Sequence, residues 1–163
     1  MIKGVGVLRK ISIYGLVAFI AVALIAAVFL YTFDLSALPE PGRAEFYLAT
    51  QARRFLVHRS AKGITMPAAA AGDDPAMAFS MDCAPCHGDN GSPLPAQGRW
   101  MNPRATRLGS PETQRYSDAE LFWVIKDGIR LTGMPGFEHT HTDAQIAGLV
   151  RYIRSLPAKE KSR

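Results

Sequence analysis

Two cysteines and a histidine stand together in the run Cys83-Ala-Pro-Cys86-His87, and the chain contains no other cysteine. This CxxCH spacing is typical of covalent haem attachment. Each thiol adds to one haem vinyl group, and the two residues between the thiols match the separation of those vinyls. The histidine that follows then lies beneath the iron and becomes its proximal ligand. The run therefore predicts one haem c held by Cys83, Cys86 and His87.

Three other kinds of site fit these residues less well. A thioredoxin-type disulfide would sit near a βαβ pattern, and the sequence shows none. A zinc site needs further cysteine or histidine ligands, for which only His139 and His141 could be recruited. A purely structural disulfide would leave the adjacent His87 without a role.

The second axial ligand is predicted to be Met134, which lies between Gly133 and Pro135. These two neighbours favour a stiff, irregular turn that can present the sulfur inward, and thioether sulfur favours Fe(II). Methionine is also a common gap-filler in protein cores. Met101 is the main rival, although it lacks the Gly-Met-Pro context. We therefore expect His87 and Met134 on the two axial positions of the iron.

The elements that must position these residues are predicted to be helices. Asp74 precedes a proline, which favours a helix start. Capping boxes open two further helices at Ser117 and Thr142. The helices are expected over about 75–83, 118–127 and 143–156, with long loops over 88–111. No segment shows the alternation of a strand, so the predicted fold class is all-α.

A charge-free run over residues 11–33 precedes this domain. Its 23 residues would form a helix of about 34 Å, long enough to span a bilayer. Lys3, Arg9 and Lys10 precede the run, which predicts a cytoplasmic N-terminus. A cleaved signal peptide is the alternative, but the run exceeds the usual apolar region and no convincing cleavage site follows. An uncleaved transmembrane anchor is expected.

Residues 34–72 are predicted to form an amphipathic basic stalk helix, over 43–62, and a linker. Its apolar positions follow the helical period at Leu48, Ala52, Phe55 and Leu56. Its basic side chains are Arg53, Arg54, His58, Arg59 and Lys62. This helix is expected either to bind the membrane surface or a partner subunit, or to be a solvated stalk.

The net charge of +5 is unevenly distributed along the chain. Residues 73–157 hold eight basic and ten acidic residues, whereas the segment 1–10 and the tail 158–163 are basic. The basic balance therefore belongs to the ends and the stalk, which argues against nucleic-acid binding.

Residues 73–157 resemble class I monohaem c-type cytochromes of the membrane-anchored bacterial type. The matching motifs are Cys83–Gly88, Ser117–Gly128, Gly133–Pro135 and Leu149–Leu156. The resemblance implies a cytochrome c fold in which the first and last helices cross, with aromatic residues Phe79 and Tyr152 in those helices. It also implies that a proline carbonyl soon after the motif, Pro95 or Pro93, accepts the N–H of His87.

This resemblance implies an electron carrier, not an enzyme, that shuttles between Fe(II) and Fe(III) in a respiratory or oxidative chain. The expected location is the bacterial inner membrane, with the haem domain in the periplasm. Expected partners are the membrane and a redox protein donor and acceptor. A cytochrome c subunit fixed in a larger redox complex through residues 43–62 is the alternative. A peroxidase or gas-binding haem protein would need an open distal position.

Overall fold

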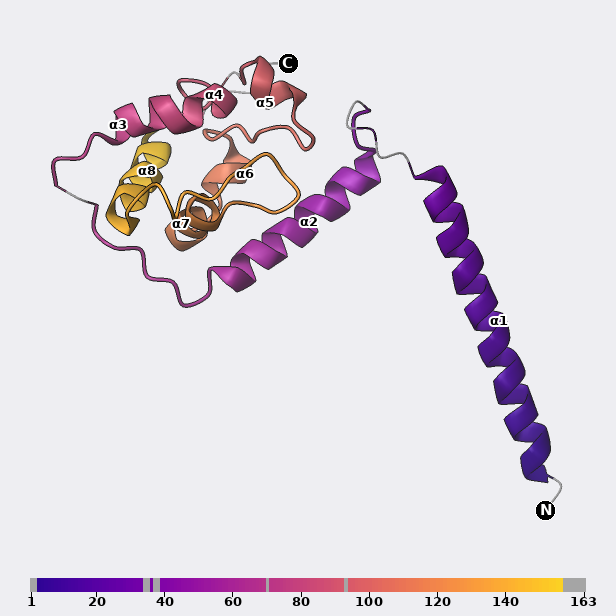
Figure 1. The fold of residues 1–163 in the computed structure, drawn as a ribbon. Coiled ribbons are helices and arrows are strands. Elements are labelled where there is room, and N and C mark those ends of the chain that lie inside the picture. Colours follow the sequence, from indigo (N-terminus) through magenta and orange to yellow (C-terminus); the bar gives the residue numbers. More distant parts are fainter. Residues whose placement is uncertain (1–2, 34–35, 37–38, 70, 93, 157–163) are drawn as a thin grey trace. The chain divides into compact units, whose positions relative to one another are not determined.

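A computed structural model describes residues 3–33, 36, 39–69, 71–92 and 94–156. Every regular element in these residues is helical, which confirms the predicted all-α class. The chain forms two compact units, Met1–Ser36 and Ala37–Arg163 (Figure 1). The predicted basic tail, 158–163, and Pro93 lie outside the described residues.

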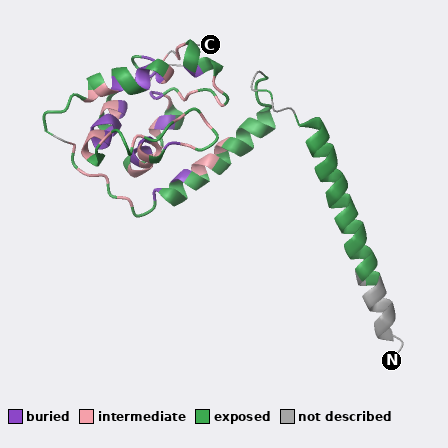
Figure 2. Ribbon diagram, in the orientation of Figure 1, coloured by how far each residue is buried: buried purple, intermediate pink, exposed green. Residues whose placement is uncertain are grey.

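The first unit is a single helix, α1 (Lys3–Thr32). Its segment Ser12–Thr32 is, among the described residues, the one helix long and apolar enough to cross a membrane. Its described side chains are exposed throughout, as Figure 2 shows in green. An apolar helix without a protein core around it has the composition and length of a membrane anchor.

The second unit begins with α2 (Arg43–Ser60), close to the helix expected over 43–62. The helix packs against α7 (Asp118–Asp127), and Val57 is 2% exposed. Ala61, which ends the helix, is 5% exposed. Burial of these apolar side chains makes α2 part of the folded unit, and the solvated-stalk interpretation is wrong for this part of the helix.

A continuous helical run leads into the cysteine motif. It comprises α3 (Pro75–Ala78), the π-helical turn η1 (Phe79–Cys83) and α4 (Ala84–His87). As predicted, Asp74 caps its start, accepting hydrogen bonds from the backbone N–H groups of Ala76 and Met77 at 3.0 and 3.1 Å. The run continues past the expected end near Cys83, so both cysteines and His87 lie on one helical segment.

The predicted capping boxes both form. Ser117 opens α7, and Thr142 opens α8 (Asp143–Ser155). The region 88–111, expected to be loop, also contains the short helix α5 (Ala96–Trp100), and α6 (Pro111–Gln114) begins at its end. Glycine within α5 lowers helix propensity, which explains why the sequence pattern did not predict this helix.

The core lies where the first and last helices of the domain cross. Helix α3 contacts α8, and the rings of Phe79 and Tyr152 are 4.9 Å apart. Ile146, Leu149 and Val150 in α8 are almost fully buried (Figure 2, purple). Gly148 of α8 faces Pro75 of α3 at this crossing: a Cβ on Gly148 would lie 3.6 Å from the Cβ of Pro75, an ordinary van der Waals contact. The arrangement agrees with the crossing implied by the resemblance.

Candidate functional site

All four predicted ligand residues line one cavity in the second unit. Cys83, Cys86 and His87 reach it from the helical run η1–α4, and Met134 reaches it from the loop after α7. The rest of the wall is mostly apolar and includes Leu108, Leu121, Val124, Ile125, Ile129 and Ile153. Residues separated by about 50 positions in the sequence thus surround a common space.

His87 is buried, and its Nδ1 lies 2.6 Å from the backbone carbonyl oxygen of Thr106. A carbonyl can only accept a hydrogen bond, so Nδ1 carries the proton and Nε2 keeps its lone pair. Burial lowers the pKa of His87, although the hydrogen bond to Thr106 acts in the opposite direction. The ring is therefore neutral near pH 7, the form that binds a metal.

The acceptor for His87 is Thr106 and not the predicted Pro95. The carbonyl of Pro95 instead accepts the backbone N–H of Arg99, at 3.1 Å, because Pro95 is the N-cap of α5. A backbone carbonyl exists at every residue, so residue types alone could not distinguish Thr106 from its neighbours.

Both cysteines are free thiols. Burial of Cys83, with smaller contributions from the charges of Asp82 and Cys86, raises the pKa of its thiol to about 12. The thiol is therefore neutral at physiological pH.

Gly98 is a supporting residue that the sequence did not single out. A Cβ at this position would lie 1.9 Å from the carbonyl oxygen of Cys86, so α5 packs directly on the backbone of the motif. A glycine within a short helix is the sequence signal that could have revealed this close approach.

Met134 is held by a loop that folds back on the end of α7. The carbonyl of Met134 accepts the N–H of Ile129 at 3.1 Å, and its own N–H donates to Thr132 Oγ1 at 3.1 Å. Gly128 permits this path: its φ is 71°, and a Cβ there would lie 2.6 Å from Gly136 N. The loop thus fixes the backbone of Met134 beside the cavity, while its side chain packs partly buried against the core.

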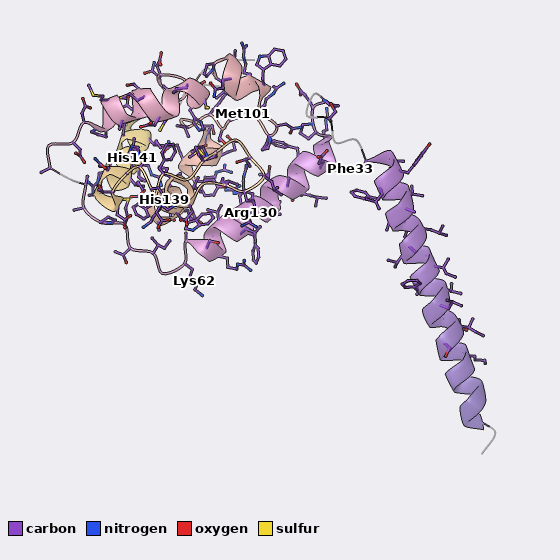
Figure 3. All side chains as sticks on the ribbon, viewed as in Figure 1. Phe33, Lys62, Met101, Arg130, His139 and His141 are labelled. Atoms are coloured by element: carbon purple, nitrogen blue, oxygen red, sulfur yellow. The ribbon has the colours of Figure 1, made fainter. Side chains whose placement is uncertain are left out.

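Met101, the predicted rival, lines the same cavity. It ends α5 and is labelled in Figure 3. Its Sδ would be 2.7 Å from a Cβ at Gly133, so it lies directly against the loop that carries Met134. Two thioethers are therefore available at the cavity wall, and the choice of Met134 as iron ligand stays a prediction.

The two histidines after the methionine loop do not line the cavity. His141 instead lies 3.3 Å from Asp82 and meets the ring of Phe137 edge-on, with centroids 5.5 Å apart. His139 is exposed (both are labelled in Figure 3). Neither is therefore positioned beside Cys83 and Cys86 as a zinc ligand would be.

Helix α2 also reaches the cavity, a contact that the sequence did not predict. Thr50, Arg53 and Arg54 are part of its wall. Guanidinium groups in the wall of a mostly apolar cavity favour an occupant that carries negative charge beside them.

The donor set fits the predicted cofactor. Two thiols, an imidazole and thioether sulfur around one cavity are the groups that would hold a covalently attached haem. The mostly apolar wall suits a flat apolar macrocycle and would limit the access of water to it.

Comparison with known families gives one match. Residues 70–153, about half of the chain, match the family described as cytochrome c oxidase, cbb3-type, subunit III. No curated protein matches the chain. The matched range contains the helical run, both cysteines, His87 and the Met134 loop, but it leaves out α1 and α2.

Proposed function

The chain belongs to this family of c-type cytochrome domains, and on that basis we propose that it transfers single electrons through one covalently attached haem. The proposal rests on one observation: the same mostly apolar cavity is lined by Cys83, Cys86, His87 and Met134. When bound, haem supplies the one-electron Fe(II)/Fe(III) couple.

Each residue has a distinct role in this proposal. The thiols of Cys83 and Cys86 form the thioether bonds, and His87 presents Nε2 while Thr106 holds its other nitrogen at 2.6 Å. Met134, on its tethered loop, would supply the second ligand. With His87 and Met134 both bound to the iron, no position would remain for a substrate, so the proposed role is that of a carrier and not of an enzyme in itself.

The proposed location rests on α1. Its span, Ser12–Thr32, anchors the chain in the bacterial inner membrane, with Lys3, Arg9 and Lys10 on the cytoplasmic side and the haem domain in the periplasm. Confinement to the membrane surface raises the effective concentration of the domain near membrane-bound donors and acceptors of a respiratory or oxidative chain.

One observation favours the second candidate, a subunit fixed in a larger redox complex. On α2, Leu48, Phe55 and Leu56 are 66%, 66% and 47% exposed, while Val57 faces the domain. An apolar stripe of this kind is typical of a surface that binds another protein. The proposed occupant is an apolar surface of a membrane-bound redox subunit.

Purification in mild detergent tests this second candidate. A fixed subunit should carry a stoichiometric partner that is lost when Phe55 and Leu48 are replaced by Ser, with the haem spectrum unchanged. A wild-type monomer that carries haem and no partner would support the independent carrier instead.

The carrier itself is tested by optical spectra of the oxidised and reduced protein, with a pyridine haemochrome assay. We expect one haem c per chain and the weak far-red band of methionine bound to Fe(III). Covalent haem without that band, together with binding of carbon monoxide by the wild type, would favour a gas-binding or peroxidase role. No haem after expression with complete maturation machinery would overturn the proposal.

A further inference from the structure

One face of helix α2 lines the cavity that Cys83, Cys86, His87 and Met134 also line. Thr50, Arg53 and Arg54 line the cavity, and Val57, one turn further along, is buried against the domain. Residues three and four apart share a helix face, so these side chains form a single surface. This helix precedes the range matched by the family, 70–153, and its contact with the site is a property of this chain.

Three contacts hold this surface in place. Val57 and Ala61 bury their side chains, and His58 Nδ1 lies 3.0 Å from Glu120 Oε1 on α7. The guanidinium carbon of Arg54 lies 5.8 Å from the centroid of the Tyr116 ring, a cation–π contact. Packing at Val57 and Ala61, directly after the two arginines, and the ring contact of Arg54 therefore hold this part of α2 at the cavity.

The charged side chains at the cavity wall differ in whether an ion pair neutralises them. The charged side chains that line it are Arg53, Arg54, Asp82, Arg104 and Glu112. Arg104 pairs with Glu40, and Asp82 pairs with His141. Within the described part of the chain, Arg53 has no ion-pair partner. A half-buried guanidinium beside an apolar wall is unfavourable unless an anion meets it.

We propose that Arg53 and Arg54 bind the propionate carboxylates of haem, so that α2 forms the propionate-binding wall of the site. This inference rests on the proposed function, because it requires haem in the cavity. The two carboxylates of haem match the two guanidinium groups in charge, and guanidinium binds a carboxylate through two parallel hydrogen bonds. The ring of Tyr116, 5.8 Å from the guanidinium carbon of Arg54, helps to hold that group at the cavity for this contact.

The contact has an electrostatic consequence for the redox couple. Positive charge near the haem stabilises Fe(II) relative to Fe(III), so both arginines raise the reduction potential. They also keep the propionates ionised, because an opposite charge favours the ionised form. Without them, the propionates take up protons more readily in one redox state than in the other, and the potential becomes dependent on pH.

The experiment uses the full-length protein, matured with haem and purified in detergent. Arg53→Gln, Arg54→Gln and the double variant are compared with Arg59→Gln, which removes the same charge from an exposed position on the same helix. Arg59 lies two residues after Val57, about 200° around the helix, and so faces away from the cavity. The measurements are the reduction potential as a function of pH and the resonance Raman band of propionate bending.

We expect the cavity variants to shift the propionate band and to lower the potential, with a new pH dependence, while Arg59→Gln changes neither. Conservative Arg53→Lys should keep most of the potential, since it keeps the charge, yet still shift the band because it loses the bidentate contact. If all variants resemble Arg59→Gln, the inference is overturned. If a glutamine variant does not acquire haem, the lysine variants test the inference instead, because the inference predicts that they too shift the propionate Raman band.

Failure of the inference and failure of the proposed function give different results. A wild-type chain that carries no haem in the pyridine haemochrome assay refutes the proposed function itself. If haem binds normally and the propionate band is the same in the wild type and in the variants at Arg53 and Arg54, only the role of α2 is refuted.

Discussion

His87 Nδ1 and the carbonyl oxygen of Thr106 lie 2.6 Å apart, across 19 positions of sequence. The contact leaves Nε2 as the ring nitrogen of His87 that can bind a metal. Because the acceptor is a backbone carbonyl, the hydrogen bond from His87 does not depend on which side chain stands at position 106.

Thr106→Val should therefore leave the hydrogen bond of His87 in place. We expect the Nδ1–H proton to remain protected from exchange in NMR spectra of the reduced protein, and the potential to stay unchanged. Insertion of one residue between Thr106 and Arg107 should displace the carbonyl and lower the protection. Protection that survives the insertion but falls in a variant altered at Pro95 would assign the acceptor to Pro95 instead.

Replacement of Met134 distinguishes it from the other thioether in the cavity. Met134→Ala should remove the far-red band of the oxidised protein, lower the reduction potential and permit carbon monoxide binding, because an axial position opens. Met101→Ala is the matched control, since Met101 lines the same cavity, and it should keep the band. The reverse pattern would make Met101 the ligand.

Gly98→Ala should interfere with the cysteine motif itself. The added methyl would lie 1.9 Å from the carbonyl oxygen of Cys86, so the backbone of α5 or of the motif must move. Overpacking of this kind costs roughly 1–3 kcal/mol, and we expect a lower Tm and less covalently bound haem per chain. Gly15→Ala within α1 is the control, because nothing lies within 4 Å of its Cβ position. Equal effects of the two variants would contradict the close approach at Gly98.

The link between α2 and α7 should weaken in acid. Glu120 is partly buried, which by itself raises its pKa, but the backbone N–H of Ser117 and the side chain of His58 outweigh burial and lower it. A carboxyl with a depressed pKa stabilises the folded state above its ordinary pKa of 4.5 and loses this contribution as the pH falls through the folded value.

Glu120→Gln should therefore lower the Tm at pH 7, and the deficit should shrink as the pH falls toward 3 and the wild-type carboxyl takes up its proton. Thermal unfolding followed by circular dichroism across this range measures the effect. Asp143→Asn serves as control, because it removes the exposed ion-pair partner of Lys126, a contact between α7 and α8. A deficit at pH 3 as large as at pH 7 would show that the charge of Glu120 is not responsible.

Local signals in the sequence predicted the parts of the fold that depend on neighbouring residues. The caps at Asp74, Ser117 and Thr142 all form, because each needs only residues within three positions. The convergence of the cysteine motif and Met134 on one cavity could be expected from ligand chemistry.

Contacts that depend on distant backbone or on the choice between helix faces could not be predicted. On α2 the periodic residues Leu48 and Phe55 are exposed, whereas Val57 and Ala61 are buried. Apolar residues occupy more than one side of this helix, so periodicity does not indicate which side meets the domain. For the same reason the approach of Arg53 to the cavity had no signal in the sequence.

The π-helical turn η1, Phe79–Cys83, sets the direction in which the cysteine motif points. A π turn holds one more residue than an α turn, which rotates everything after it by about 100° relative to a continuous α-helix. Phe79 can therefore face the core and Tyr152, while Cys83, Cys86 and His87 face the cavity. The one extra residue of the π turn thus lets a single helical segment direct Phe79 toward the core and the cysteine motif toward the cavity. Deleting Ser80 would restore an ordinary α-helix and turn Cys83, Cys86 and His87 away from the cavity.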